Sequence, residues 1–181
     1  MGGSTGATAY VVTADRITFS TGATAAYTAA NLSQARTLLA GCSDTVVYGY
    51  ALGGYSGAYV ATTDRVTFAT STTVAWTAAN VSLTRDYFQG LSDGAVYGYA
   101  LGGWSGVAVT TTDRITFSTS STAAYTAGNV SSARSDTTNV SDGSVYGYVC
   151  GGYTTAIWAN SDRVTFSTGA SAAYTAANLS Q

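Results

Sequence analysis

The sequence predicts an all-β fold made of four copies of one unit, and three observations support this prediction. The composition is rich in Thr, Val and Tyr, which favour pleated, half-buried strands. Glu, Lys, His and Pro are missing, so amphipathic surface helices have almost no material. The phrase Asp-Arg-Ile/Val-Thr-Phe recurs every 49 residues, starting at Asp15, Asp64, Asp113 and Asp162. A repeat of this length is typical of a protein assembled from supersecondary units.

The repeat divides the chain into the units 1–34, 35–83, 84–132 and 133–181, which we expect to form one domain. A second phrase, Thr-Ala-Ala/Gly-Asn-Leu/Val-Ser, has the same spacing and starts at Thr28, Thr77, Thr126 and Thr175. Pairs of glycines recur as well, at Gly2-Gly3, Gly53-Gly54, Gly102-Gly103 and Gly151-Gly152. Because several features agree at fixed offsets, the repeat covers the whole chain.

Within the second unit, four strand-like runs are separated by turn residues. We expect the first run at 37–42, before the turn at Ser43-Asp44, and the second at 46–52. The second run alternates large residues with small ones, which predicts a strand buried on both faces and a close neighbouring sheet. The third and fourth runs follow at 65–70 and 73–78. The fourth carries Trp76, which is a tyrosine in the other units.

Four antiparallel strands in a repeat of about 40 to 50 residues are the unit of a β-propeller blade. The pattern also resembles the kelch repeat, in which a strand ends in Gly-Gly, a polar loop leads to a charged strand with an aromatic, and Arg opens the next repeat. The matching residues of the second unit are Gly53-Gly54, Asp64 with Phe68, Trp76 and then Arg85. The resemblance implies a kelch-type β-propeller of which the chain covers about three and a half blades, in about 14 strands.

The charge and hydropathy of the chain exclude several classes of partner. The formal net charge is −2 and the sequence has no basic run, so we do not expect a nucleic-acid partner. No window reaches the length of a membrane span, so we expect no membrane insertion. The Ala/Thr/Ser/Tyr-rich style is similar to kelch-like repeats of phage structural and tail proteins, which implies an extracellular or virion-associated location.

The sequence offers little for catalysis or metal binding. With no His, neither a zinc site nor a Ser-His-Asp arrangement can be assembled, so we expect no metal, no cofactor and no enzymatic activity. Asp86 and Asp93 could hydrolyse a glycoside as a pair, but Asp is expected in loops and turns in any case. Cys42 and Cys150 occupy apolar positions in units that are not adjacent, so we expect two buried free thiols.

The arginines recur with the repeat, at Arg16, Arg65, Arg114 and Arg163 and at Arg36, Arg85 and Arg134. Side chains that recur in every unit are expected to fasten units together through carboxylates or backbone carbonyls. On this interpretation, Arg65→Ala would leave a buried carboxylate without its partner.

The residues after the double glycines are the candidate ligand-binding site. Tyr55, Trp104 and Tyr153 occupy equivalent loops, and Trp158 is unique to its unit. Aromatic rings beside hydroxyl groups and glycines suit a sugar, which predicts a lectin that uses these loops. The alternative is that each ring packs against the next unit.

Two hypotheses about function follow. The first is a non-catalytic scaffold that presents loops to a protein partner, and the second is the lectin. The first unit contains only its last two strands, so the arc is expected to expose two apolar faces, one at each end, and a bare strand edge. We therefore expect self-association, most simply as a homodimer.

Overall fold

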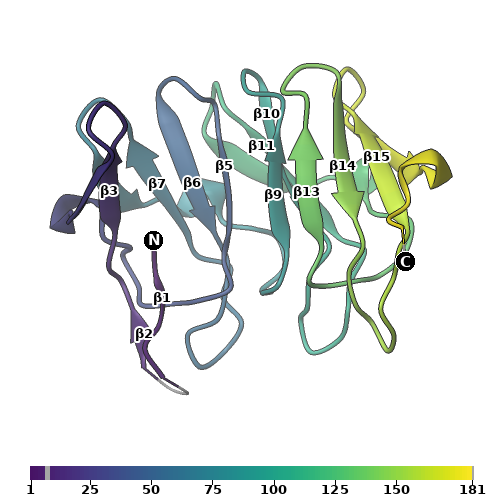
Figure 1. Ribbon diagram of the computed structural model, residues 1–181, viewed down its shortest axis with the longest axis horizontal. Coiled ribbons are helices and arrows are strands. Elements are labelled where there is room, and N and C mark those ends of the chain that lie inside the picture. The colour runs from purple at the N-terminus through teal and green to yellow at the C-terminus, as the bar shows by residue number, and fades with distance from the viewer. Residues whose placement is uncertain (7–8, 181) are drawn as a thin grey trace.

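The computed structural model describes residues 1–6 and 9–180, and its regular structure is almost entirely β (Figure 1). The second, third and fourth units each form a four-stranded antiparallel sheet, in which strand order follows chain order. The first unit forms a two-stranded sheet, β3–β4. This confirms the predicted all-β class and the four strands predicted for the second, third and fourth units.

The three complete sheets have the following strands. The second unit contains β5 (Ala40–Ser43), β6 (Tyr48–Leu52), β7 (Thr63–Thr67) and β8 (Thr72–Ala75). The third contains β9 (Gln89–Ser92), β10 (Tyr97–Leu101), β11 (Thr112–Thr116) and β12 (Ser121–Ala124). The fourth contains β13 (Thr138–Ser141), β14 (Tyr146–Cys150), β15 (Ser161–Thr165) and β16 (Ala170–Ala173).

The first unit contains β3 (Asp15–Thr18) and β4 (Ala23–Ala26), preceded by a short pair that the sequence did not predict, β1 (Gly3–Ser4) and β2 (Tyr10–Val11). Every unit ends in one turn of 3₁₀ helix after its last strand. These turns are η1 (Thr28–Ala30), η2 (Thr77–Ala79), η3 (Thr126–Gly128) and η4 (Thr175–Ala177).

The two strands expected at 37–42 and 46–52 begin later than predicted. The first begins at Ala40 because Leu38 has a φ of 58°, which no extended strand allows. Thr37 instead forms an isolated bridge with Tyr55. The second begins at Tyr48 because the Asp44 carboxylate accepts the N–H groups of residues 46–48 and holds them in the turn.

The strands expected at 65–70 and 73–78 begin one or two residues earlier and end sooner. β7 stops at Thr67, and Ser71, with a φ of 54°, completes the turn by donating its N–H to Phe68. β8 stops at Ala75 because the chain then folds into η2. Asn80, which follows η2, accepts the N–H of Thr63 at 2.8 Å and ties this segment to the start of β7.

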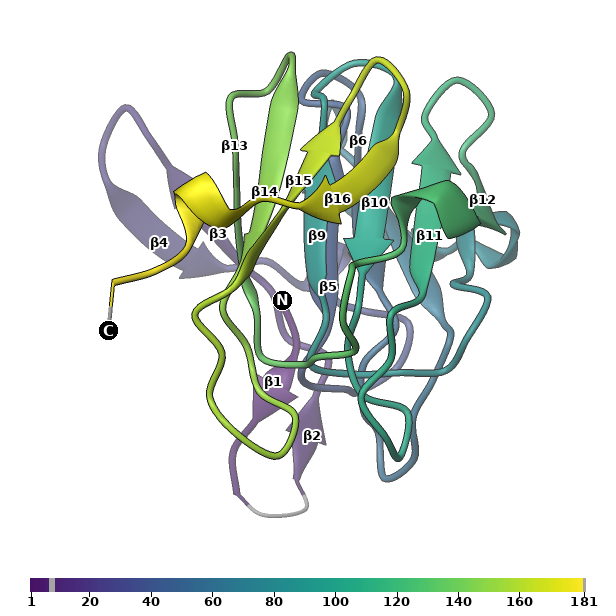
Figure 2. The same cartoon turned by 90° about the vertical axis from the view of Figure 1, so that its right-hand side faces the viewer.

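The sheets stack face to face as a fan whose first strands, β5, β9 and β13, lie side by side (Figure 1). The close approach of β5 and β9 requires glycine, because a Cβ on Gly90 would lie 2.0 Å from the carbonyl oxygen of Gly41. The last strands of the sheets lie on the outside of the fan, as β12 and β16 do in Figure 2. The fan is open over the residues that the structure describes, so the sheets do not close into a ring.

Two hydrophobic clusters fill the spaces between neighbouring sheets. One lies between the second and third units and includes Tyr50, Leu52, Phe88, Ile115 and Phe117. The other lies between the third and fourth units and includes Leu91, Tyr99, Val149, Val164 and Phe166. The predicted small face of the second strand is confirmed: a Cβ on Gly98 would meet Cys42 at 2.7 Å, and one on Gly147 would meet Leu91 at 2.2 Å.

The described residues contain no helix long and apolar enough to cross a membrane. Both cysteines are free, as predicted. Cys150 is buried as predicted, but Cys42 is only partly buried, on the face of its sheet that packs against the third unit.

Candidate functional site

Each complete unit encloses one buried ion pair. The pairs are Arg36–Asp64, Arg85–Asp113 and Arg134–Asp162, and all six side chains are inaccessible to solvent. In the first two pairs a guanidinium nitrogen lies 2.9 Å from a carboxylate oxygen. Each arginine also donates to a carbonyl of its own second strand, that of Ala51, Ala100 or Val149. Burial lowers the pKa of Arg36 and Arg85, and the facing carboxylate opposes that shift.

The ion pairs sit where consecutive units are joined. The Asp64 carboxylate also accepts the N–H of Ser33, which belongs to the preceding unit, and Asp113 accepts that of Ser82 in the same way. The main chain of each arginine links the units too. The carbonyl oxygens of Arg36, Arg85 and Arg134 accept the N–H groups of Gly3, Gly54 and Gly103, each at 3.0 Å. The same junction is therefore built three times.

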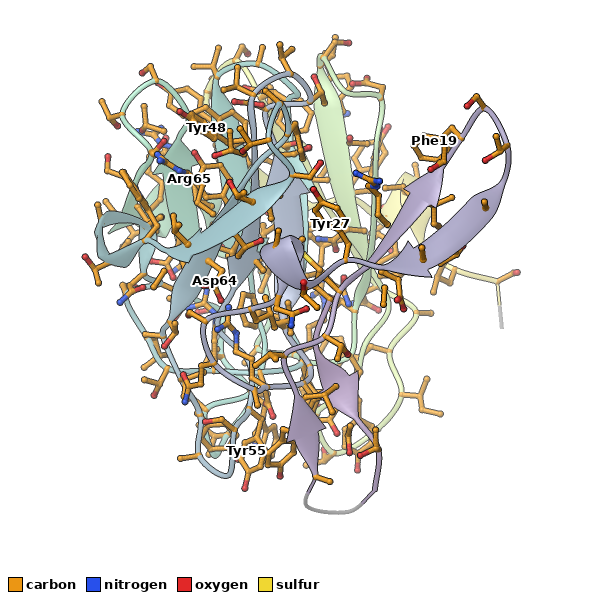
Figure 3. The ribbon with its side chains drawn as sticks, turned by 90° about the vertical axis from the view of Figure 1, so that its left-hand side faces the viewer. Phe19, Tyr27, Tyr48, Tyr55, Asp64 and Arg65 are labelled. Carbon is orange, nitrogen blue, oxygen red and sulfur yellow. The ribbon has the colours of Figure 1, made fainter. Side chains whose placement is uncertain are left out.

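The second set of arginines does not pair with the predicted carboxylates, although Arg65 does reach the next unit, where it donates to the Ser120 hydroxyl at 3.2 Å. Arg65 lies between two aromatic rings, with its guanidinium carbon 3.4 Å from the centre of Trp76 and 4.2 Å from that of Tyr48. Figure 3 shows Arg65 beside Tyr48, with Asp64 some way along the strand. The expectation that Arg65→Ala would leave a buried carboxylate unpaired is therefore wrong, because Asp64 pairs with Arg36 on the opposite face of β7.

The first unit has the same residues without their partners. Asp15 is exposed and forms no ion pair within the described residues, although its three counterparts are all paired. Arg16 stacks on Tyr27 alone, at 4.3 Å, whereas Arg65, Arg114 and Arg163 each have two rings. Phe19 projects from the β3–β4 hairpin with 95% of its surface exposed (Figure 3).

A cavity of about 610 Å³ lies beside this unit, against the face of the second sheet. It is lined mainly by apolar groups, among them Leu39, Cys42, Tyr50, Val66 and Phe68. Burial, and then the nearby Asp44 carboxylate, raises the pKa of the Cys42 thiol to about 12. The thiol is therefore protonated at neutral pH and is not a nucleophile.

The two junctions between complete sheets differ at several positions, among them Trp76, which is Tyr125 in the next unit, and Ser120. Between the second and third units, Ser120 accepts hydrogen bonds from the Tyr50 hydroxyl at 2.8 Å and, through its carbonyl, from the Trp76 indole at 2.8 Å. Position 169 is the equivalent of Ser120 in the next unit, and it is glycine. The hydroxyl of Tyr99, the counterpart of Tyr50, is buried without a hydrogen-bond partner.

The predicted ligand-binding aromatics lie in loops of three consecutive units, and two of them pack against other rings. Tyr55 stands edge-on to Tyr10 of the first unit and to Tyr59, with ring centres 5.8 and 5.6 Å apart. The Trp104 indole donates to the Tyr59 hydroxyl at 3.1 Å, across the boundary between units. Both rings therefore contact the preceding unit, whereas the alternative weighed for the loops placed each ring against the next unit.

The other two candidates belong to the last unit. Tyr153 is 46% exposed and stands next to the hydroxyl groups of Thr154 and Thr155 in the chain. Trp158 is partly buried, and its indole donates to the Thr154 hydroxyl at 3.0 Å. A second cavity, of about 430 Å³, lies beside Trp158 and Leu179.

Sequence reasoning missed the environment of Asp86, which occupies the position of Thr37 and Ser135. Asp86 is buried, and its Oδ1 atom has no hydrogen-bond partner. Burial raises the pKa of this carboxyl to about 6, and the nearby Asp136 adds to the shift. The neighbouring Tyr87 hydroxyl is affected by both carboxylates as well: its pKa is raised by burial, then by Asp136 and by Asp86. The sequence gives no sign of this burial, because Asp86 simply follows Arg85 in a polar segment. Only the three-dimensional structure places Asp86 near Asp136.

The aspartate pair considered for glycoside hydrolysis is not assembled. Asp86 precedes β9 and Asp93 follows it, so the two carboxyl groups lie at opposite ends of the strand. The Asp93 carboxylate is occupied in its turn by the N–H groups of residues 95–97. Across residues 1–6 and 9–180, no three Cys, Asp or Glu side chains come together as metal ligands.

Comparison of the sequence with protein-family models and with curated proteins finds no match. The functional argument therefore rests on the geometry of the repeated junctions and of the first unit.

Proposed function

We propose that the chain is a non-catalytic scaffold of β-propeller type, built from kelch-like repeats, that works by association. The observation that carries this proposal is a backbone hydrogen bond shared by the three junctions, in which Gly3, Gly54 and Gly103 each donate to an arginine carbonyl at 3.0 Å. Junctions that share this bond apply a similar rotation at each step. Such a series of four-stranded sheets, with the first strands innermost, curves around a common axis.

The two ends of the fan supply the surface for association. Val140 on the last sheet is 58% exposed, whereas Leu91 at the equivalent position is covered by the fourth unit. At the other end, Ile17 and Phe19 are exposed on the β3–β4 hairpin. Exposed apolar side chains at both ends favour self-association, and a closed two-fold dimer is the commonest form.

Light scattering after size exclusion tests the proposal at micromolar concentration. The wild-type chain is expected to elute as a dimer, and Phe19→Ser or Val140→Ser is expected to shift it towards a monomer. Val107→Ser is the matched control, because Val107 is similarly exposed but lies in a loop of the third unit. A stable wild-type particle of 18.3 kDa would overturn the association.

A glycan ligand is the second candidate, and the exposure of Tyr153 beside two threonine hydroxyls is the observation that favours it. On a broad glycan array, the chain would bind a set of sugars that Tyr153→Ala no longer binds. Tyr55→Ala serves as the comparison, because Tyr55 already packs between two rings. An array without hits would end this candidate.

A further inference from the structure

The first unit offers a binding site for a further β-hairpin. Each group in this site has an equivalent in a complete unit, and there the equivalent group has a partner. In each complete unit, the last two strands pair with a hairpin formed by the first two, as β7 pairs with β6. β3 is the counterpart of β7, yet its other edge carries no strand among the described residues. Its N–H and C=O groups on that edge are available for pairing.

The half unit is already held in the conformation of a complete one. Ala14 donates its N–H to Asn31 at 3.0 Å, as Thr63 does to Asn80. Gly2 donates to the Thr13 carbonyl at 2.9 Å, as Gly53 does to Thr62. The site is therefore preformed, and little ordering of β3–β4 has to accompany binding.

Three groups in the site lack the contact that the same group makes elsewhere. The exposed Asp15 carboxylate matches Asp113, which pairs with the buried Arg85. Arg16 stacks on Tyr27 but lacks the second ring that Tyr97 gives to Arg114. Phe68 remains 41% exposed, whereas Tyr50 and Tyr99 cover the equivalent Phe117 and Phe166 with centroids 5.8 and 6.0 Å away.

All three missing groups belong to one segment of the repeat. In the third unit, Arg85, Tyr97 and Tyr99 lie on the stretch that leads into β9 and on β10. The cavity of about 610 Å³ is lined by Val66 and Phe68, which lie on the face of the second sheet where the equivalent hairpin of a complete unit would pack. The unpaired edge of β3, the charge of Asp15 and the apolar face around Phe68 therefore all fit the same partner, a hairpin like the first two strands of a complete unit.

We propose that the β3 edge and the adjoining cavity bind, by strand addition, a β-hairpin of the repeat's first-half type presented by a partner polypeptide. The hairpin would supply one arginine to Asp15, one tyrosine to Arg16 and a second tyrosine to Phe68. A second intact copy of the chain is a poor donor, because the arginines of its complete units are all buried within their own sheets. The inference goes beyond the proposed function, since it holds whether or not the ends of the fan associate.

A synthetic peptide with the sequence of residues 82–101 is the probe, labelled and titrated with the full chain in a fluorescence anisotropy experiment. One peptide is expected to bind per chain. Replacing the arginine of the peptide by Gln, or Asp15 of the chain by Asn, is expected to weaken binding at least about tenfold, and the two changes together little more than either alone. A scrambled peptide is the control. No binding, or binding that Asp15→Asn leaves unchanged, would overturn the inference.

A fusion in cis covers the case in which the free peptide aggregates. A copy of residues 82–101 placed directly before Gly2 completes the unit, because Leu101 precedes Gly102 in the same way. The fusion is expected to raise the Tm by more than about 5 °C and to abolish binding of the added peptide. An unchanged Tm would count against the site. A chain that is monomeric but binds the peptide would overturn the association proposed above and leave this inference standing.

Discussion

Residues 15–19 and residues 113–117 have the same sequence, Asp-Arg-Ile-Thr-Phe, and opposite environments. In the first unit all five residues are exposed, whereas in the third Asp113, Ile115 and Phe117 are buried. Both segments form a strand that pairs on one edge with the strand that follows it, β4 for β3 and β12 for β11, so the local backbone is alike. Burial in this protein is therefore set by the neighbouring hairpin and the neighbouring sheet, not by the phrase itself.

The largest effect that tests this comparison is expected from the two aspartates. Asp113→Ala should lower the free energy of unfolding by about 3 to 5 kcal/mol, because it leaves the Arg85 charge buried without a partner. Asp15→Ala changes the same position in an exposed strand and should stay within about 0.5 kcal/mol of wild type. Urea unfolding of both variants measures the difference. Equal losses would mean that Asp15 is engaged in solution.

A second test contrasts two buried carboxylates of the third unit. Asp113 pairs with Arg85, whereas Asp86 has no cationic partner among the described residues. The folded-state pKa of Asp86 is raised to about 6 from an ordinary 3.8, so the folded protein binds the extra proton. The contribution of Asp86 to the free energy of unfolding is therefore fully present below about pH 4 and is lost as the pH rises through about 6. Asp86→Asn should therefore raise stability at pH 7 by about 2 kcal/mol.

The measurement is the Tm of wild type and of Asp86→Asn between pH 4 and pH 8. The two curves should meet near pH 4 and separate as the pH increases. A constant offset across this range would show that Asp86 does not carry the pH dependence.

The smallest effect separates the two complete junctions from each other. Tyr50→Phe removes the hydrogen bond to Ser120 and should cost about 1 kcal/mol. Tyr99→Phe removes a hydroxyl that has no partner, so its cost should be about zero or slightly favourable. Thermal unfolding of both variants compares them directly. If Tyr99→Phe costs as much as Tyr50→Phe, its hydroxyl has a partner in solution.

The sequence was sufficient to predict what depends on spacing. The 49-residue period, the composition and the turn residues predicted three all-β units of four strands and the β3–β4 hairpin of the first unit, but not the short β1–β2 pair before it. Strand ends were predicted less well, because they depend on single backbone conformations such as the φ of 58° at Leu38. A positive φ at a leucine has no signature in the residue itself.

The candidate site was harder to predict because it depends on which residues face each other. Arg65 and Arg36 both recur with the 49-residue period, and only the pleat of β7 places Asp64 with Arg36 and turns Arg65 towards Trp76. The loop aromatics were identified correctly as a recurring set. Whether Tyr55 is free or packed depends on Tyr10, which belongs to a different unit and to a loop that is two residues longer there.

The junction aspartates have a consequence for the mechanics of the molecule. Asp64 holds the backbone of the preceding unit through Ser33 and the arginine of its own unit, so it is a fastener shared by two units. Opening one unit therefore removes a backbone hydrogen bond from the buried aspartate of the next unit and weakens the ion pair there. Unfolding should consequently be a single cooperative event, and a pulling force applied along the chain should be borne by all three fasteners together.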